Sequence, residues 1–101
     1  MRVIKMDTMG ATEIDMDFDA FMDDSGISWD CRSIDADNDV WVDDEGLLAP
    51  GVSVARIGRA GRVPLPAYVV GLDGEACTDT TLSLATIEAM TTWTMTEPKS
   101  A

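Results

Sequence analysis

The sequence contains no histidine, only two cysteines and few basic side chains. Histidine is the side chain that most often serves as a general base and as a metal ligand, so its absence removes the usual basis for both kinds of site. A zinc site built around Cys31 and Cys77 would need mainly carboxylate ligands, which is unusual. We therefore expect no metal, no cofactor and no enzymatic activity. Both cysteines are expected to be buried free thiols, with a disulfide or a reactive thiol as the alternative.

Long apolar runs are missing as well. No stretch approaches the about 20 apolar residues that a membrane-spanning helix needs. Residues 1–7 include basic side chains but no apolar core of the kind found in signal peptides. We expect a cytoplasmic protein that binds no membrane.

The chain is nevertheless expected to fold. It has 101 residues, 46% of them hydrophobic, and three tryptophans, which favours one globular domain over disorder. We predict a single domain over residues 1–96 and a disordered C-terminal tail over residues 97–101.

The acidic residues are concentrated in one half of the sequence. Residues 13–45 hold 13 of the 19 acidic side chains and one basic side chain, Arg32. This stretch therefore carries −12, equal to the formal net charge of the whole chain, whereas residues 51–101 carry −1. Such a surface repels nucleic acid and attracts basic protein surfaces, so we expect no direct nucleic-acid binding.

Alternating apolar residues or short apolar segments rich in β-branched residues predict strands, and a change of period predicts helices. The predicted strands cover residues 1–8, 13–18, 27–34, 40–42 and 67–71. Phe18, Phe21 and Met22 have helical spacing, so a short helix should follow a cap at Asp15 or Asp17 and end at Gly26. A second helix is predicted over residues 82–90, capped by Asp79, Thr80 or Thr81, with residues 91–96 fraying because threonine is a poor helix former.

The remaining segments should be turns and loops. Residues 35–39, 43–46 and 72–75 are predicted turns, and Leu47 and Leu48 should return to the core. Residues 52–62 predict a mobile loop or a loose hairpin, and Pro64 and Pro66 suit a sheet edge or a turn. Together these elements predict a small α+β fold, with one mostly antiparallel sheet of four to six strands and two short helices.

Three short segments resemble a known family in the same order along the chain. They are Met1-Arg2-Val3-Ile4-Lys5, Val40-Trp41-Val42-Asp43-Asp44-Glu45-Gly46-Leu47-Leu48, and Tyr68-Val69-Val70-Gly71-Leu72-Asp73-Gly74-Glu75 followed by a helix rich in Thr, Leu and Glu. Over most of residues 1–90 the chain resembles the phage- and plasmid-borne domain of unknown function 3846 family. The resemblance implies an accessory protein of a mobile element in a bacterial host, and it brings no catalytic residues.

Two charged constellations have a structural and a functional interpretation. Asp35, Asp37 and Asp39 begin like a calcium-binding loop, but Val40 stands where a glycine is needed and Gly46 where a glutamate is needed, so a hairpin turn is favoured. The second constellation is three arginines that could contact phosphate, although pairing with the acidic half of the chain is favoured: Arg56, Arg59 and Arg62.

The acidic half supplies the main functional hypothesis. Rows of carboxylates on a strand or at a turn can imitate the phosphates of a nucleic acid. The candidate partner-binding residues are Asp35, Asp37, Asp39, Asp43, Asp44 and Glu45 in two turns that should be exposed and adjacent in a hairpin, with Asp15, Asp17 and Asp19 on a strand.

By analogy of charge and origin, we expect an inhibitor of a host nucleic-acid-binding defence complex, of the anti-CRISPR or anti-restriction type, acting on a basic groove. The first alternative is a structural or scaffolding phage accessory protein, acidic only for solubility. A halophilic protein is a second alternative, although halophiles spread acid over the whole surface. Association with a second copy as a homodimer is left open.

Overall fold

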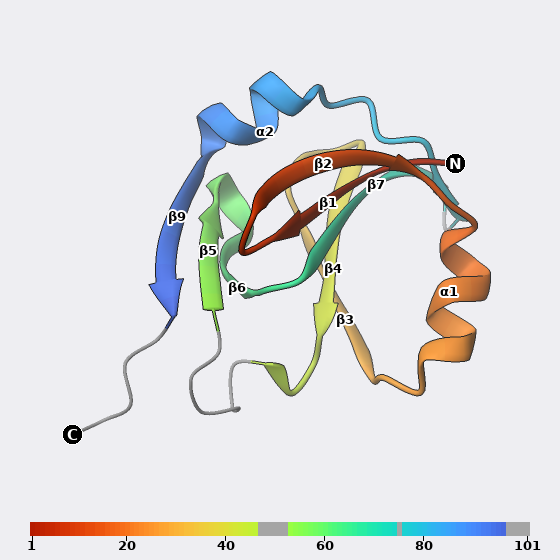
Figure 1. Cartoon of the computed structure of the whole chain (residues 1–101). Coiled ribbons are helices and arrows are strands. Elements are labelled where there is room, and N and C mark those ends of the chain that lie inside the picture. The colour runs from red at the N-terminus through yellow and green to blue at the C-terminus, as the bar shows by residue number, and fades with distance from the viewer. Residues whose placement is uncertain (47–52, 75, 97–101) are drawn as a thin grey trace.

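The computed structural model describes residues 1–46, 53–74 and 76–96, and it confirms the α+β class (Figure 1). In chain order the elements are β1 (Arg2–Asp7), β2 (Gly10–Asp15), α1 (Phe18–Ser25), β3 (Trp29–Ser33), β4 (Asn38–Asp43), β5 (Ser53–Ile57), the 3-10 helix η2 (Gly58–Ala60), β6 (Gly61–Pro64), β7 (Ala67–Asp73), β8 (Ala76–Thr78), α2 (Leu84–Met90) and β9 (Thr91–Thr96). Within these ranges, no helix is long and apolar enough to cross a bilayer.

The strands form two antiparallel sheets rather than one. Sheet A has six strands in the order β2-β1-β7-β4-β3, and β8 pairs with the end of β7. Sheet B has three strands in the order β6-β5-β9. The expected sheet of four to six antiparallel strands corresponds to sheet A, and the separate sheet B is an addition.

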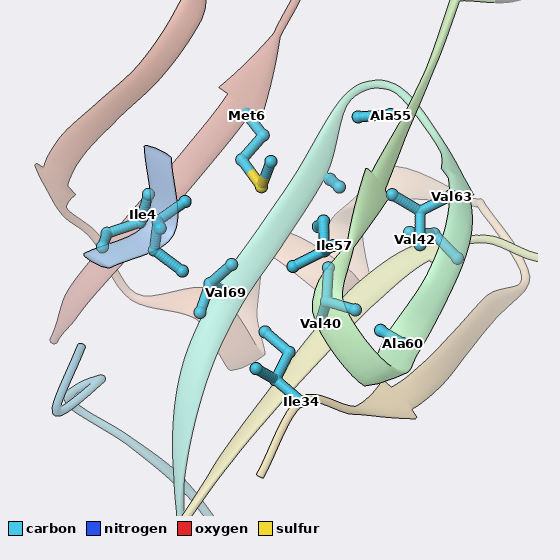
Figure 2. Close-up of a cluster of buried hydrophobic side chains, with 12 residues drawn as sticks. Ile4, Met6, Ile34, Val40, Val42, Ala55, Ile57, Ala60, Val63 and Val69 are labelled. Carbon is cyan, nitrogen blue, oxygen red and sulfur yellow. The ribbon is translucent and has the colours of Figure 1, made fainter. Parts of the chain in front are cut away.

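Both faces of sheet A are covered: sheet B lies on one face and α1 lies on the other. One face packs against sheet B, where Val40 and Val69 of sheet A meet Ile57 and Val63 (Figure 2), and Ile87 of α2 joins the same cluster. The other face packs against α1 through Phe18. Because successive side chains of a strand point to opposite faces, the central strand β7 is buried on both.

The first helix forms as its sequence predicts. The carboxylate of Asp17 accepts a hydrogen bond from the Ala20 amide at 3.2 Å and caps the helix. Gly26 ends it with a φ of 69°, a left-handed conformation that favours glycine.

The second helix begins two residues later than predicted, because the expected caps have other partners. Asn38 is fully buried, and its side-chain oxygen accepts hydrogen bonds from the Thr80 hydroxyl at 2.7 Å and the Thr81 amide at 3.1 Å. Asp79 instead accepts from the Arg2 amide at 2.7 Å. Ser83 is the cap that remains.

One further prediction is wrong. Residues 91–96 do not fray as helix but form β9, paired with β5, since β-branched threonine suits a strand. Of the two alternatives predicted for residues 52–62, the hairpin is confirmed over the described residues: β5, η2 and β6 form it, and its Ala55, Ile57 and Val63 are fully buried. The predictions for Leu47, Leu48 and the tail 97–101 lie outside the described residues.

Candidate protein-binding surface

The first acidic turn is held together by its own carboxylate. Asp35 accepts hydrogen bonds from the Asp37 amide at 2.8 Å and from the Asn38 side-chain amide at 3.0 Å. This is the Asx turn that the sequence favours over a calcium loop. No group of three or more metal-binding side chains is close enough to hold an ion within the described parts of the chain.

Asp39 is not part of that turn, so its predicted exposure is wrong. It is the second residue of β4 and only 9% exposed, because the pleat points it onto the α1 side of sheet A. Burial raises the pKa of the Asp39 carboxyl, nearby Asp35 raises it further, and a hydrogen bond from the Cys31 thiol lowers it. Asp39 is therefore removed from the candidate contact residues.

The two acidic turns are not adjacent. In the β3–β4 hairpin Ser33 pairs with Asp39 at one end and Trp29 pairs with Asp43 at the other. The length of β4 separates the turns by roughly 17 Å. The second turn lies instead near the end of α1, where the Asp44 amide donates to the Ser28 carbonyl at 2.8 Å and the Ser28 hydroxyl donates to the Asp44 carboxylate at 3.2 Å.

Asp15, Asp17 and Asp19 do not form one row on a strand, because β2 ends at Asp15. The Asp15 carboxylate accepts a hydrogen bond from the Met1 amino group at 2.9 Å, Asp17 caps α1, and Asp19 projects from the first turn of the helix. The three side chains nevertheless remain exposed and follow one another into α1.

The helix contributes acids that the sequence interpretation missed. Asp23 and Asp24 are exposed in α1, and Asp19 and Asp23 share a face because they are four residues apart. The apolar spacing of residues 18–22 predicts the helix. Its polar positions are occupied by Asp19, Asp23 and Asp24, and this pattern in the sequence could have identified an acidic helix face. Seven exposed acids thus flank or lie on α1, a surface that we call the α1 acidic surface: Asp15, Asp17, Asp19, Asp23, Asp24, Asp44 and Glu45.

Three exposed arginines lie elsewhere in the molecule. Arg56 lies directly opposite Arg62 in the β5–β6 pair, and Arg59 follows on η2. Figure 1 shows these elements and α1 at opposite ends of the molecule. Within the described residues neither Arg56 nor Arg59 forms an ion pair, so the predicted pairing with the acidic half is wrong for both. The charges of the two ends are therefore segregated.

Both cysteines are free, but the expectation that both are buried is wrong. Cys31 is exposed and Cys77 half-buried. Partial desolvation raises the pKa of the Cys31 thiol, and the charges of Asp39 and Asp30 raise it further. The thiolate, which is the reactive form, is therefore disfavoured at Cys31.

We compared the chain with protein-family models, with curated proteins and with solved structures, and none of the three comparisons found a match. The family resemblance of the sequence stays a prediction.

Proposed function

We propose that this protein is a non-enzymatic inhibitor whose α1 acidic surface occupies a basic groove of a host nucleic-acid-binding protein. The observation that carries the proposal is the set of exposed carboxylates on α1. Asp19, Asp23 and Asp24 have no cationic partner among the described residues, while the exposed arginines lie at the far end of the molecule. An unpaired acidic helix is free to pair with a basic partner.

The dimensions of this surface suit a groove that holds nucleic acid. An eight-residue helix is about 12 Å long, and acids continue beyond both of its ends, to Asp15 on one side and to Asp44 and Glu45 on the other. A duplex presents phosphates on a similar length scale, with about one charge per 1.7 Å of axis. Association would be steered by charge and would weaken as salt rises.

The resemblance to a mobile-element family sets the proposed context. Inhibition of a host nucleic-acid-binding defence complex in the bacterial cytoplasm, that is, action of the anti-CRISPR or anti-restriction type, fits both that context and the charge. This choice of target rests on the sequence resemblance and on analogy of charge.

A scaffolding role with a solubilising acidic surface is the second candidate, and one observation favours it. Several acids make local contacts that stabilise the fold without any partner. Three carboxylates each accept a hydrogen bond from the backbone amide two residues ahead: Asp7, Asp35 and Asp43. Glu13 forms an ion pair with Arg2. These acids account for part of the charge but not for the unpaired acids of α1.

Competition with nucleic acid separates the two candidates. The experiment captures the partner from bacterial lysate on immobilised protein and then adds duplex DNA. An inhibitor that occupies the groove is displaced by DNA, and it blocks DNA binding by the purified partner. A scaffolding protein would leave the partner able to hold DNA and this chain together.

A further inference from the structure

An aromatic pocket lies beside the α1 acidic surface. It has a volume of about 210 Å³ and opens between the end of α1, the start of β3 and the turn from β6 to β7. Phe21, Trp29 and Tyr68 supply its aromatic walls, and the turn adds Pro64 and Pro66. Such a volume admits a single side chain rather than a larger ligand.

The three rings are inclined to one another rather than stacked. Their centroids are 5.1 Å apart for Phe21 and Tyr68, 5.7 Å for Phe21 and Trp29, and 5.8 Å for Trp29 and Tyr68, with interplanar angles of 54°, 58° and 73°. The Trp29 indole N–H donates to the Ser25 hydroxyl at 3.0 Å, which fixes that ring. Ile27, also in the lining, is 40% exposed, so this apolar wall is open to solvent.

The lining contains one charged side chain, the carboxylate of Asp43. Asp43 is the cross-strand partner of Trp29, so the carboxylate and the indole stand on neighbouring strands at the same end of the hairpin. One carboxylate oxygen accepts the Glu45 amide at 2.9 Å, which orients the group. Asp44 and Glu45 follow directly and add negative charge near the pocket.

We propose that this pocket binds the guanidinium group of an arginine side chain from a basic partner. A cation is attracted to the face of an aromatic ring, and a carboxylate beside the rings supplies the counter-charge. Arginine suits the pocket better than lysine, because its guanidinium is planar, weakly hydrated and forked toward carboxylate oxygens. The partner's identity rests on the proposed function, in which this arginine anchors the basic groove against the α1 acidic surface.

The direct test uses a capped peptide, Gly-Gly-Arg-Gly-Gly, and the same peptide with citrulline, the neutral isostere of arginine. Each is titrated into the isotopically labelled protein at about 0.15 M salt, where diffuse charge effects are screened. The expected result is a saturable shift of the Trp29 indole N–H signal with the arginine peptide, and at least about tenfold weaker binding of the citrulline peptide.

A pair of variants completes the test. Asp43→Asn keeps an acceptor for the Glu45 amide and removes the charge, so it should weaken binding of the arginine peptide by about tenfold. The matched control, Asp73→Asn, removes an exposed acid that lies outside both the lining and the α1 acidic surface, and it should change affinity less than about twofold. Three results would each contradict arginine binding in the pocket. They are equal binding of the citrulline peptide, equal effects of the two variants, and signal shifts confined to α1 with the Trp29 signal unchanged. Those results would leave the proposed function standing, since it is judged by DNA competition with the whole partner.

Discussion

Asp19 and Asp23 lie one helical turn apart on α1, with both carboxylates exposed to solvent. Like charges in this arrangement repel, and Asp23 also stands near the negative end of the helix dipole. Neither acid has a cationic partner among the described residues. The charge of Asp19 is favoured in the first turn, but the charge of Asp23 and its repulsion with Asp19 oppose the stability of the helix. An unfavourable charge that the fold does not need is expected where a surface binds a partner.

Removing one of these charges should stabilise the protein. We predict that Asp23→Asn raises the free energy of unfolding by about 0.2–0.5 kcal/mol, measured by urea denaturation at low salt. Asp17→Asn is the contrasting variant, because it takes negative charge from the positive end of the same helix and should lower stability by about 0.3–1 kcal/mol. Equal losses in both variants would show that the helix charges do not repel.

Moderate salt should raise the melting temperature. Screening weakens the repulsion among the exposed acids, and the Debye length falls to about 10 Å at 0.1 M salt. The measurement is thermal unfolding between low salt and about 0.3 M NaCl. A flat or falling melting temperature would argue against a repulsive acidic surface, and a requirement for molar salt would favour a halophilic protein instead.

Asp39 should make stability depend on pH. Burial, followed by the charge of Asp35, raises the pKa of this carboxyl in the folded state, so the folded protein binds its proton more tightly than the unfolded chain. Its contribution to stability is thus greatest at low pH, and it falls as the pH rises from the unfolded value near about 4 through the raised folded value.

The variant Asp39→Asn tests this contribution, because the amide keeps an acceptor for the Cys31 thiol and cannot ionise. We expect it to be more stable than wild type at neutral pH, with a gain that shrinks as the pH falls through the raised folded pKa and is lost below about 4. Asp37→Asn, in the exposed turn, should gain less at neutral pH. A gain for Asp39→Asn that does not change with pH would contradict the role given to burial.

Gly71 should tolerate no side chain. A Cβ atom at this position would lie 2.1 Å from the backbone oxygen of Asp79, so β7 and the segment after β8 would have to separate. We predict that Gly71→Ala lowers the free energy of unfolding by about 1–3 kcal/mol. Ala76→Ser, exposed on β8, should stay within about 0.5 kcal/mol of wild type in the same denaturation experiment. Similar stabilities for the two variants would contradict the close approach.

The sequence predicted those helices and strands that depend on neighbouring residues, and it did not predict those that depend on contacts between distant residues. The β-branched residues of β1 and β7 and the cap and stop of α1 needed only neighbouring residues. The start of α2 could not be predicted this way, because Asn38 engages Thr80 and Thr81 from 42 and 43 residues away. The threonines of β9 favour a strand locally, but its partner strand, β5, could not be predicted from neighbouring residues.

The sequence shows that residues 13–45 are acidic, but it does not show where each carboxylate lies in the fold. A series of acidic residues has the same sequence pattern whether its residues lie in a turn or in a strand. Asp39 belongs to β4 rather than to the turn, and β4 sets the two turns apart. The pocket beside Asp43 joins residues from five elements, α1, β3, β4, β6 and β7, so no spacing in the sequence marks it.

The most direct test of the central proposal is the affinity of the captured partner for a triple variant of α1, Asp19→Asn with Asp23→Asn and Asp24→Asn. The control pair, Asp73→Asn with Glu88→Gln, removes exposed acids outside the α1 acidic surface. We expect the triple variant to bind at least about tenfold more weakly, a loss of about 1.4 kcal/mol, and no longer to displace DNA, while the control pair binds within about twofold of wild type. A triple variant that binds as wild type and still displaces DNA would show that the α1 acidic surface does not occupy the groove.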